Sequence, residues 1–317
     1  MPMDRFILAP LAGYTDKAFR EIALSMGADI AVTEMVSAEG LARNSGKTKA
    51  LLERADGEER LVIQLFAPDE DPVARSMEQL LEYSPTVIDI NCGCPVPKVV
   101  KTGAGSALMK EPEKIRRIVK TIRSFTQIPV SVKFRLGWDS NSVNYLQFAE
   151  SALSGGAEIL TLHARTRAQL YSGAADRSAF RALAAAFRGS GVTLYGSGDV
   201  FTPEDAVARI DEDGLDGVMF ARGAIGNPFI FRETKELVEH GSYTLPSREE
   251  RLGTVMRHYD LMVRYYGQTV AGPEMRKHAM AYLKGLEGAK EAKAKLTKAM
   301  TRDDYLEALG LAGSSLH

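Results

Sequence analysis

The stretch 87–95, Val-Ile-Asp-Ile-Asn-Cys-Gly-Cys-Pro, places an apolar strand pattern directly before a loop that carries a thiol. The loop region 92–111 is longer than the roughly 2–6 residues that usually join a strand to a helix. A long loop at the end of a parallel strand is typical of a functional site, so Cys94 is a candidate functional residue. The alternative is a cysteine that only packs, because free cysteine is among the most buried residue types.

Strand patterns like this one recur through the first 220 residues and alternate with segments of helical period. The expected strands are 6–9, 29–32, 61–66, 87–91, 130–134, 158–163, 192–195 and 217–220. Helix start signals lie between them, as in 202–205, Thr-Pro-Glu-Asp, which combines an N-cap residue, a proline and an acidic residue. Parallel strands need crossover helices, and eight such units can close. The sequence therefore predicts the α/β class and a (β/α)8 TIM barrel.

The pattern changes to helix alone after residue 240. Residues 241–246 form a plausible linker, Ser247 and Glu250 form a capping box, and a second helix is expected over 273–286. We expect a barrel domain over 1–240 and a small all-α domain over 247–317. Residues 245–317 hold 12 Lys and Arg against 9 Asp and Glu, whereas residues 1–244 hold 28 against 32. The basic excess could face a polyanion, and a solvated helical surface is the other interpretation.

The composition is that of an ordinary globular protein, with 45% hydrophobic and 26% charged residues. The two cysteines, spaced C-x-C, cannot supply a disulfide framework, so we expect a cytoplasmic protein. The first residues have no basic region, and Pro10 breaks their apolar stretch, which argues against a signal peptide or a membrane span. The five histidines are scattered, so no metal site is expected.

The residues that end each strand line the active site of a barrel, which selects a short list of candidates. Glycine-rich turns at 196–199 and 221–226 favour a phosphorylated ligand, because small residues let backbone N–H groups approach an anion. Lys133 lies in an apolar strand and could form a Schiff base or hold negative charge on a cofactor. His163 is expected to contact a cofactor or substrate. The stretch 103–108 lacks the third glycine and the preceding strand of a dinucleotide-binding loop, so that interpretation is rejected.

Several of these motifs, in this order, closely resemble the bacterial tRNA-dihydrouridine synthases. The resemblance rests on Ala9–Gly13 with Thr15-Asp16, Asp89–Pro95, Gly105–Leu108, Lys133 with Arg135, His163 with 165–167, 197–199, 216–219 and 274–278. It covers the barrel from end to end and extends into the helical tail. Two positions depart from the family pattern. Ser197 replaces a frequent asparagine and Ala221 a frequent glycine, which puts individual hydrogen bonds to the phosphate in doubt.

The resemblance implies a flavin enzyme that reduces the 5,6 double bond of uridine in tRNA, using FMN and a nicotinamide donor. The family favours NADPH, although the sequence does not separate NADPH from NADH. Lys133 would contact the flavin ring, Gln64 its polar edge, and residues 197–199 with 221–222 the phosphate. The residues implied in cofactor binding are Pro10, Leu11, Ala12, Gln64, Lys133, His163, Ser197, Gly198, Asp199, Ala221 and Arg222.

The resemblance also implies that Cys94 donates the proton that accompanies hydride from reduced FMN, while Cys92 packs. A cysteine remains mostly protonated at neutral pH and so can serve as a general acid. Asn91 would bind the target uracil. The candidate tRNA contacts are Lys98, Lys101, Arg135, Arg165 and Arg167 at the rim, with Arg276 and Lys277 in the tail.

The resemblance makes the helical tail a tRNA-recognition domain of a protein that we expect to be monomeric. Two rival functions remain. The first is that of a flavin-dependent barrel enzyme that acts on a free pyrimidine, such as dihydroorotate dehydrogenase. The second is that of a tRNA-binding protein without catalytic activity. The first would not require the basic tail. The second would have no use for Cys94, Lys133 and His163 together. The target uridine positions are not encoded in the motifs.

Overall fold

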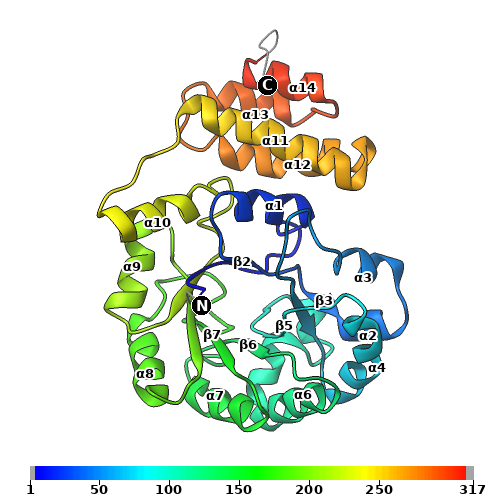
Figure 1. Ribbon diagram of the computed structural model, residues 1–317, viewed down its shortest axis with the longest axis vertical. Coiled ribbons are helices and arrows are strands. Elements are labelled where there is room, and N and C mark those ends of the chain that lie inside the picture. The colour runs from blue at the N-terminus through cyan, green and yellow to red at the C-terminus, as the bar shows by residue number, and fades with distance from the viewer. Residues whose placement is uncertain (1–3, 312–317) are drawn as a thin grey trace.

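The computed structural model describes residues 4–311, in which every strand pairs in parallel within one curled sheet (Figure 1). The sheet order is β2-β1-β9-β8-β7-β6-β5-β4-β3. A parallel bridge between Val32 and Val62 joins its two ends, so the sheet closes as the predicted (β/α)8 barrel. The strands are β1 Phe6–Leu8, β2 Ile30–Ala31, β3 Val36–Ser37, β4 Val62–Phe66, β5 Val87–Cys92, β6 Val130–Arg135, β7 Ile159–His163, β8 Thr193–Ser197 and β9 Gly217–Phe220.

The expected second strand, 29–32, occurs as two short strands, β2 and β3, and β3 was not predicted. Thr33 lies between them, and its Oγ1 accepts the backbone N–H of Gln64 at 3.1 Å. A side chain thus replaces the backbone carbonyl that would have continued the ladder. The two pieces together occupy one of the eight strand positions of the barrel.

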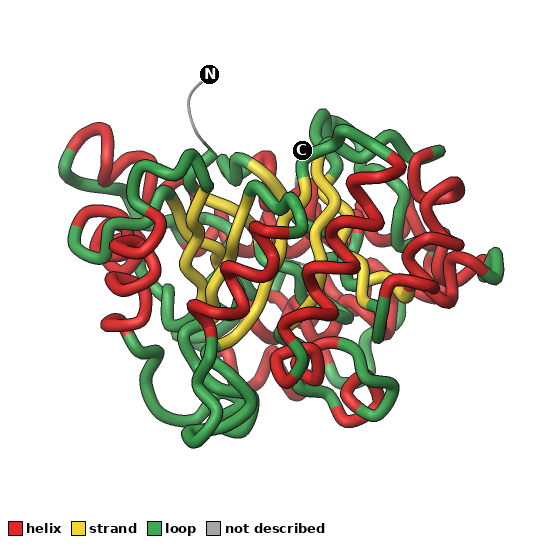
Figure 2. The backbone as a smooth tube through the Cα atoms, turned by 90° about the horizontal axis from the view of Figure 1, so that it is seen from below, coloured by secondary structure: helices red, strands yellow, loops and turns green. Residues whose placement is uncertain are grey.

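Helices surround the strands, as Figure 2 shows. The helices before residue 245 are α1 Lys17–Ser25, α2 Ala38–Ala42, α3 Gly46–Ala50, α4 Glu70–Leu81, α5 Pro97–Val100, α6 Pro112–Phe125, α7 Tyr145–Ser154, α8 Arg177–Phe187, α9 Pro203–Asp211 and α10 Ile230–His240. The capping box predicted at Thr202 is present, because Thr202 and Asp205 each bond the other's backbone N–H. The long loop after β5 contains α5 and a 3-10 helix, Gly105–Lys110.

The alternation of side chains along β5 separates the core from the barrel interior. Ile88, Ile90 and Cys92 belong to the hydrophobic cluster between the sheet and its helices, and each is buried. The prediction that Cys92 packs is therefore confirmed. Asp89 and Asn91 point to the other face, because successive residues of a strand alternate. The same strand thus supplies both packing and chemistry.

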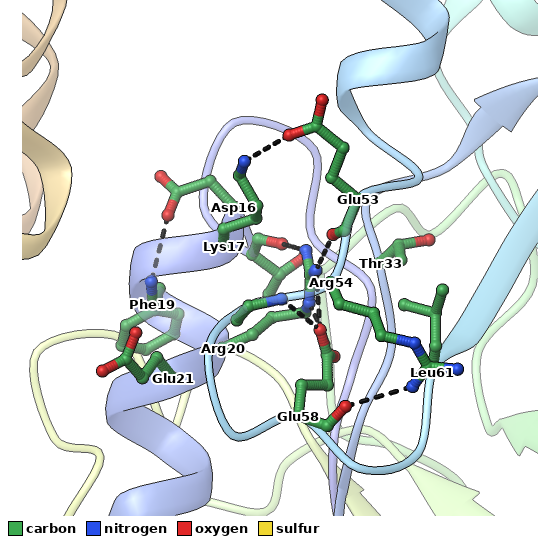
Figure 3. A network of polar contacts seen from close by, with 12 residues as sticks. Asp16, Lys17, Phe19, Arg20, Glu21, Thr33, Glu53, Arg54, Glu58 and Leu61 are labelled. Atoms are coloured by element: carbon green, nitrogen blue, oxygen red, sulfur yellow. Dashed lines mark hydrogen bonds and ion pairs between the residues drawn. The ribbon is translucent and has the colours of Figure 1, made fainter. Parts of the chain in front are cut away.

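A buried ion pair ties α1 to the irregular segment 51–61 (Figure 3). The Arg20 guanidinium donates to both carboxylate oxygens of Glu58 at 2.9 Å and to the Glu53 carbonyl at 2.7 Å. Glu58 also accepts the backbone N–H of Ala55. Because every strong donor and acceptor of this buried pair has a partner, the charges fix the position of α1 beside β1 at a tolerable desolvation cost.

Within the described residues, four further helices follow residue 246 and form a bundle beside α1 and α10 (Figure 1). They are α11 Arg248–Tyr266, α12 Gln268–Tyr282, α13 Ala289–Leu296 and α14 Arg302–Leu309. Ser247 caps α11 as predicted, but α12 begins five residues before the expected start, so Pro273 lies inside it. A single residue, Gly267 with φ of 76°, separates α11 from α12.

The C-terminal helices share one hydrophobic cluster with β1, α1 and α10. The loop after β9 touches α12 closely, because a Cβ added to Gly226 would lie 2.3 Å from the backbone carbon of Ala281. The expected division into domains of 1–240 and 247–317 stays a prediction, and its ends at 1–3 and 312–317 lie outside the described residues.

Candidate active site

One cavity of about 720 Å³ opens at the carboxyl ends of the barrel strands. Asn91, Cys94 and Arg135 line it from the β5 and β6 side. It also gathers every residue expected to bind a cofactor: Pro10, Leu11, Ala12, Gln64, Lys133, His163, Ser197, Gly198, Asp199, Ala221 and Arg222. Residues spread over more than 200 positions of sequence thus share one cavity, while their individual roles remain predictions.

The backbone that carries Cys94 is held on both sides. The Asn91 side-chain oxygen accepts the backbone N–H groups of Gly93 and Cys94 at 3.2 and 2.9 Å, and Ser106 N–H donates to the Cys94 carbonyl at 3.0 Å. Gly105 makes this approach possible, since a Cβ there would lie 2.8 Å from the Cys94 carbonyl oxygen and its φ is +62°. Both polar groups of the Cys94 backbone are therefore used to orient the loop.

The Cys94 thiol is held in its protonated form. Burial raises its pKa, and the opposing effects of the Val96 N–H group and the Arg135 charge do not outweigh burial. A thiol of this kind donates a proton more readily than it acts as a thiolate nucleophile at neutral pH. The side chain lines the cavity and is partly accessible.

Arg135 and Arg165 lie inside the barrel wall, which corrects the expectation that they stand at the rim. Their exposed fractions are 2% and 1%. Arg135 donates to the carbonyls of Gly93, Thr166 and Leu170 at 2.7 to 3.0 Å, and so links the Cys94 loop to the loop after β7. Arg165 donates to Gly173 O at 2.6 Å and Asp199 at 2.5 Å. Loop carbonyls hold both guanidinium groups inside the protein, and a contact of the cavity-lining Arg135 with tRNA stays a prediction.

Asn91 and Gln64 are similarly engaged within the protein. Asn91 Nδ2 donates to Gln64 Oε1 at 2.8 Å, and Gln64 Nε2 donates to Asp89 Oδ2 at 2.6 Å. Each amide keeps one N–H toward other partners, while the acceptor of Asn91 is already shared by two backbone groups. The expected contact of Asn91 with the target uracil stays a prediction. Such a contact would have to use the remaining side-chain N–H of Asn91.

Lys133 and His163 occupy the interior between β6 and β7. Burial lowers the pKa of Lys133 to about 8, with a further lowering by Arg135 and an opposing effect of Asp89. Burial also lowers the pKa of His163 well below its usual range, assisted by the charges of Lys133, Arg135, Arg165 and Arg222. His163 is consequently neutral at pH 7 and offers one donor and one acceptor.

The loops after β8 and β9 form a cradle around Arg222. Asp199 Oδ1 accepts Arg222 Nη2 at 3.2 Å, while its Oδ2 accepts Arg165 and the Ala175 N–H. Burial alone would raise the pKa of Asp199, but the hydrogen bonds from Arg165 and Ala175 outweigh it and lower that pKa. The Asp199 carboxylate thus orients two arginines, while the expected contact of residues 197–199 with a phosphate stays a prediction.

Two glycines allow the loops of this cradle to pack closely. A Cβ on Gly198 would lie 2.8 Å from His163 Cδ2, and one on Gly223 would lie 2.2 Å from the Val200 carbonyl oxygen. Arg222 also faces two aromatic rings, with its guanidinium carbon 4.8 Å from the Tyr171 centroid and 5.3 Å from that of Phe201. The cation is therefore held in place before any ligand binds.

The remaining candidate tRNA contacts differ in accessibility. Lys98 and Lys101 are exposed on and just after α5, near Cys94. Arg167 is partly buried, 4.5 Å from the Trp138 ring centroid. In the tail, Arg276 donates to the Ala299 carbonyl and to Met300, so its guanidinium is used in packing. Lys277 pairs with Glu274 beside Tyr14.

Some residues of the site escaped sequence reasoning. The cavity mouth carries four exposed apolar side chains, Val96, Leu170, Tyr171 and Phe201, each about half exposed. Only the folded loops bring them together, so no sequence pattern marks them. Asp89 is the other omission, a fully buried carboxylate. Its signal was present, because an acid between Ile88 and Ile90 breaks an apolar strand.

Within residues 4–311, no group of three or more His, Cys, Asp or Glu side chains is arranged to hold a metal ion. None of the helices described there combines the length and apolar character needed to cross a bilayer.

Comparison with known proteins agrees with this site. The family model described as Dihydrouridine synthase (Dus) matches residues 7–313. A probable tRNA-dihydrouridine synthase of Treponema pallidum is 42% identical over 287 residues, covering 88% of this chain and 84% of that protein. The tRNA-dihydrouridine synthase B of Vibrio cholerae is 34% identical over 309 residues, covering 96% and 94%.

A solved structure shows the same fold at much lower identity. A 2-naphthoyl-CoA reductase matches with a TM-score of 0.56 and 10% identity, covering 74% of this chain and 50% of that one. At this identity the likeness concerns the fold alone. The match of the family model to almost the whole chain, together with the relatives above 30% identity, shows that this chain belongs to the dihydrouridine synthase family.

Proposed function

We propose that the protein is a tRNA-dihydrouridine synthase that uses FMN and a nicotinamide donor to reduce the 5,6 double bond of uridine in tRNA. The family and the names of the relatives support the reaction and the substrate. The cavity supports the cofactor class. The same residues that carry the sequence resemblance meet in it, at the end of the barrel where active sites form.

One observation carries the proposal, namely the concentration of positive charge around the cavity. Lys133, Arg135, Arg165 and Arg222 all act on His163, and Asp199 neutralises only part of their charge. Buried like charges are costly unless a ligand of opposite sign joins them. A phosphorylated, anionic cofactor supplies that charge, with its phosphate at Arg222 and its ring system deeper, beside Lys133.

The residues present fit FMN. The volume of about 720 Å³ lies within the range of roughly 300–1,000 Å³ typical of cofactor and small-molecule sites. Gly198 and Gly223 let the cradle loops pack against His163 and Val200, which a side chain at either position would prevent. Lys133, with a pKa of about 8, is mainly a cation at pH 7 and would favour negative charge on the ring.

The protein itself contributes a proton donor at a defined position. Bound FMN would supply a hydride equivalent, previously taken from the nicotinamide, to one carbon of the uracil double bond. Cys94 then gives its thiol proton to the adjacent carbon, so one S–H bond breaks and one C–H bond forms. The resulting thiolate regains a proton from solvent. Arg135 stabilises that thiolate, because its charge lowers the pKa of Cys94.

A uracil in folded tRNA must leave its stack to reach this cavity, which costs a few kcal/mol. The exposed apolar side chains at the mouth offer surfaces on which bases can stack. Lys98 and Lys101 stand next to that mouth and can meet phosphate groups. In the tail, Lys290 and Lys293 of α13 add positive charge, whereas Lys277 and Lys295 pair with Glu274 and Glu307.

The decisive experiment is reconstitution. Purified protein is loaded with FMN and incubated with unmodified tRNA and NADPH, and then with NADH, while dihydrouridine is quantified by mass spectrometry of nucleosides. We expect dihydrouridine only when protein, FMN and nicotinamide are all present. Mapping the modified positions in tRNA from a deletion strain identifies the target uridines. Oxidation of dihydroorotate without any product on tRNA would favour the free-pyrimidine function instead.

A further inference from the structure

We propose that Asp89 is a positioning residue that sets the direction of a hydrogen-bond relay ending at the Cys94 loop. The mechanism above does not use Asp89, although it is a fully buried carboxyl group. Burial of a charged or polar group is expensive unless it gains partners, so an apolar residue would serve mere packing better. Its link to catalysis rests on the proposed function, whereas its effect on the loop does not.

The relay begins where β4 and β5 lie in register. Gln64 is the partner of Asp89 across the two strands, and Asn91 lies two residues farther along β5 on the same face. Gln64 Nε2 donates to Asp89 Oδ2 at 2.6 Å, and Asn91 Nδ2 donates to Gln64 Oε1 at 2.8 Å. Asn91 Oδ1 then accepts the backbone N–H groups of Gly93 and Cys94.

The hydrogen-bonding groups at the two ends of the relay fix its donor-to-acceptor direction. Backbone N–H groups can only donate, so Asn91 must turn its oxygen to the loop and its NH2 group to Gln64. Gln64 must then turn its oxygen to Asn91 and its NH2 group to residue 89. Residue 89 must therefore accept, which a carboxylate does in any orientation. An asparagine at 89 could instead donate, and an inverted relay would leave the loop N–H groups facing an NH2 group.

Asp89 keeps an acceptor oxygen toward Gln64 in either protonation state, although burial raises its pKa on balance. Gln64, Ser131 and the charge of Lys133 oppose that rise in pKa. Asp89 Oδ1 has no hydrogen-bond partner, so the residue depends on Gln64 for a strong neutral donor. Lys133 is the partner of Asn91 across β5 and β6, which places the cation beside the relay.

The test is Asp89→Asn, an isosteric change after which residue 89 accepts in one orientation of its amide and donates in the other. Hydrogen exchange of the peptide spanning 92–95 is measured by mass spectrometry, with the remaining peptides as internal references. Loss of one net hydrogen bond predicts about tenfold faster exchange there. Alkylation of Cys94 by iodoacetamide should change in parallel, and the Cys94→Ala variant identifies its signal. Neither readout needs cofactor or tRNA, so failure here and failure of the proposed function are separate outcomes.

Two further variants distinguish an effect on the direction of the hydrogen-bond relay from a general loosening of the structure around Asp89. Ser131→Ala removes a polar neighbour of Asp89 without breaking the relay, and it should leave exchange at 92–95 unchanged. Asp89→Asn combined with Gln64→Glu restores an acceptor toward Asn91, and exchange should return toward the native rate. Equal acceleration in Ser131→Ala, or no rescue in the double variant, would overturn the proposal.

A measurement on the native protein covers the case in which Asp89→Asn does not fold. The side-chain amide protons of Gln64 and Asn91 can be followed by NMR in labelled protein. The relay predicts that the bonded proton of each amide exchanges far more slowly than that of an exposed amide. Rapid exchange of both would reject the relay.

Discussion

The two walls of the cavity are held together by different kinds of polar interaction. The wall that carries Cys94 is held mainly by side-chain amides, from Gln64 through Asn91 to the loop backbone, with one guanidinium group, that of Arg135, at the Gly93 carbonyl. The opposite wall is held by charge, with Asp199 between Arg165 and Arg222. Hydrogen bonds between neutral groups fix geometry without adding a field, whereas the arginines create one. In the proposed function, the first wall would place a proton and the second would attract an anion.

The largest effect is expected from Cys94→Ala on the amide-held wall. Loss of the general acid should slow dihydrouridine formation by about 10²–10⁴-fold while FMN and tRNA binding persist. Single-turnover kinetics with pre-reduced enzyme measures that step directly. Unchanged turnover would remove Cys94 from the mechanism.

Cys92→Ala is the matched control on the same strand. Its side chain lies in the outer core, so the change should cost about 1 kcal/mol or more in the free energy of unfolding and leave turnover within about threefold. Urea denaturation measures the first quantity. Equal loss of turnover in both cysteine variants would mean that loop shape, and not the proton, was being altered.

A smaller effect is expected from Arg222→Ala on the charged wall. Hydrogen bonds to charged groups contribute about 1.5–3 kcal/mol, so FMN should bind roughly 10–150-fold more weakly. Riboflavin, which lacks the phosphate, should bind with unchanged affinity, as fluorescence quenching can show. Equal weakening of both ligands would place Arg222 at the ring and not at the phosphate.

A change in tRNA binding is expected from charge reversal at the mouth. Lys98→Glu and Lys101→Glu should each weaken tRNA binding several-fold and reduce the dependence of log Kd on log salt by about 0.7–0.9. Lys120→Glu on the outer side of α6 serves as the control. Filter binding at several salt concentrations measures both. Identical slopes of log Kd against log salt in all three variants would mean that tRNA binds at another surface.

The smallest expected effect concerns the acidity of Cys94. Because burial raises the pKa of this thiol, iodoacetamide should label it only slowly at pH 7, with a midpoint above that of free cysteine. Arg135→Gln should raise that midpoint further, since the Arg135 charge lowers the pKa. A midpoint below 8 would indicate an activated thiolate, contrary to a proton-donating role.

Sequence reasoning succeeded where local pattern decides the structure. Apolar runs such as Val87–Ile90 and the cap at Thr202 follow from alternation and capping chemistry, so the barrel was predictable. The packing of Cys92 in the core followed likewise. The burial of Arg135 and Arg165 was harder to predict, because both side chains turn inward toward loop carbonyls that only the folded chain brings near. The aromatic pair around Arg222 depends on two loops meeting and has no sequence signal.

The contact between Gly226 and α12 limits how this architecture can be recombined. The loop that carries Arg222 and the backbone near Ala281 touch without room for a methyl group. A chimera that borrows its C-terminal helices from a relative must keep glycine at this junction, or the phosphate end of the cavity will shift with the graft. The helical tail therefore also supports the wall of the cavity, whatever it binds.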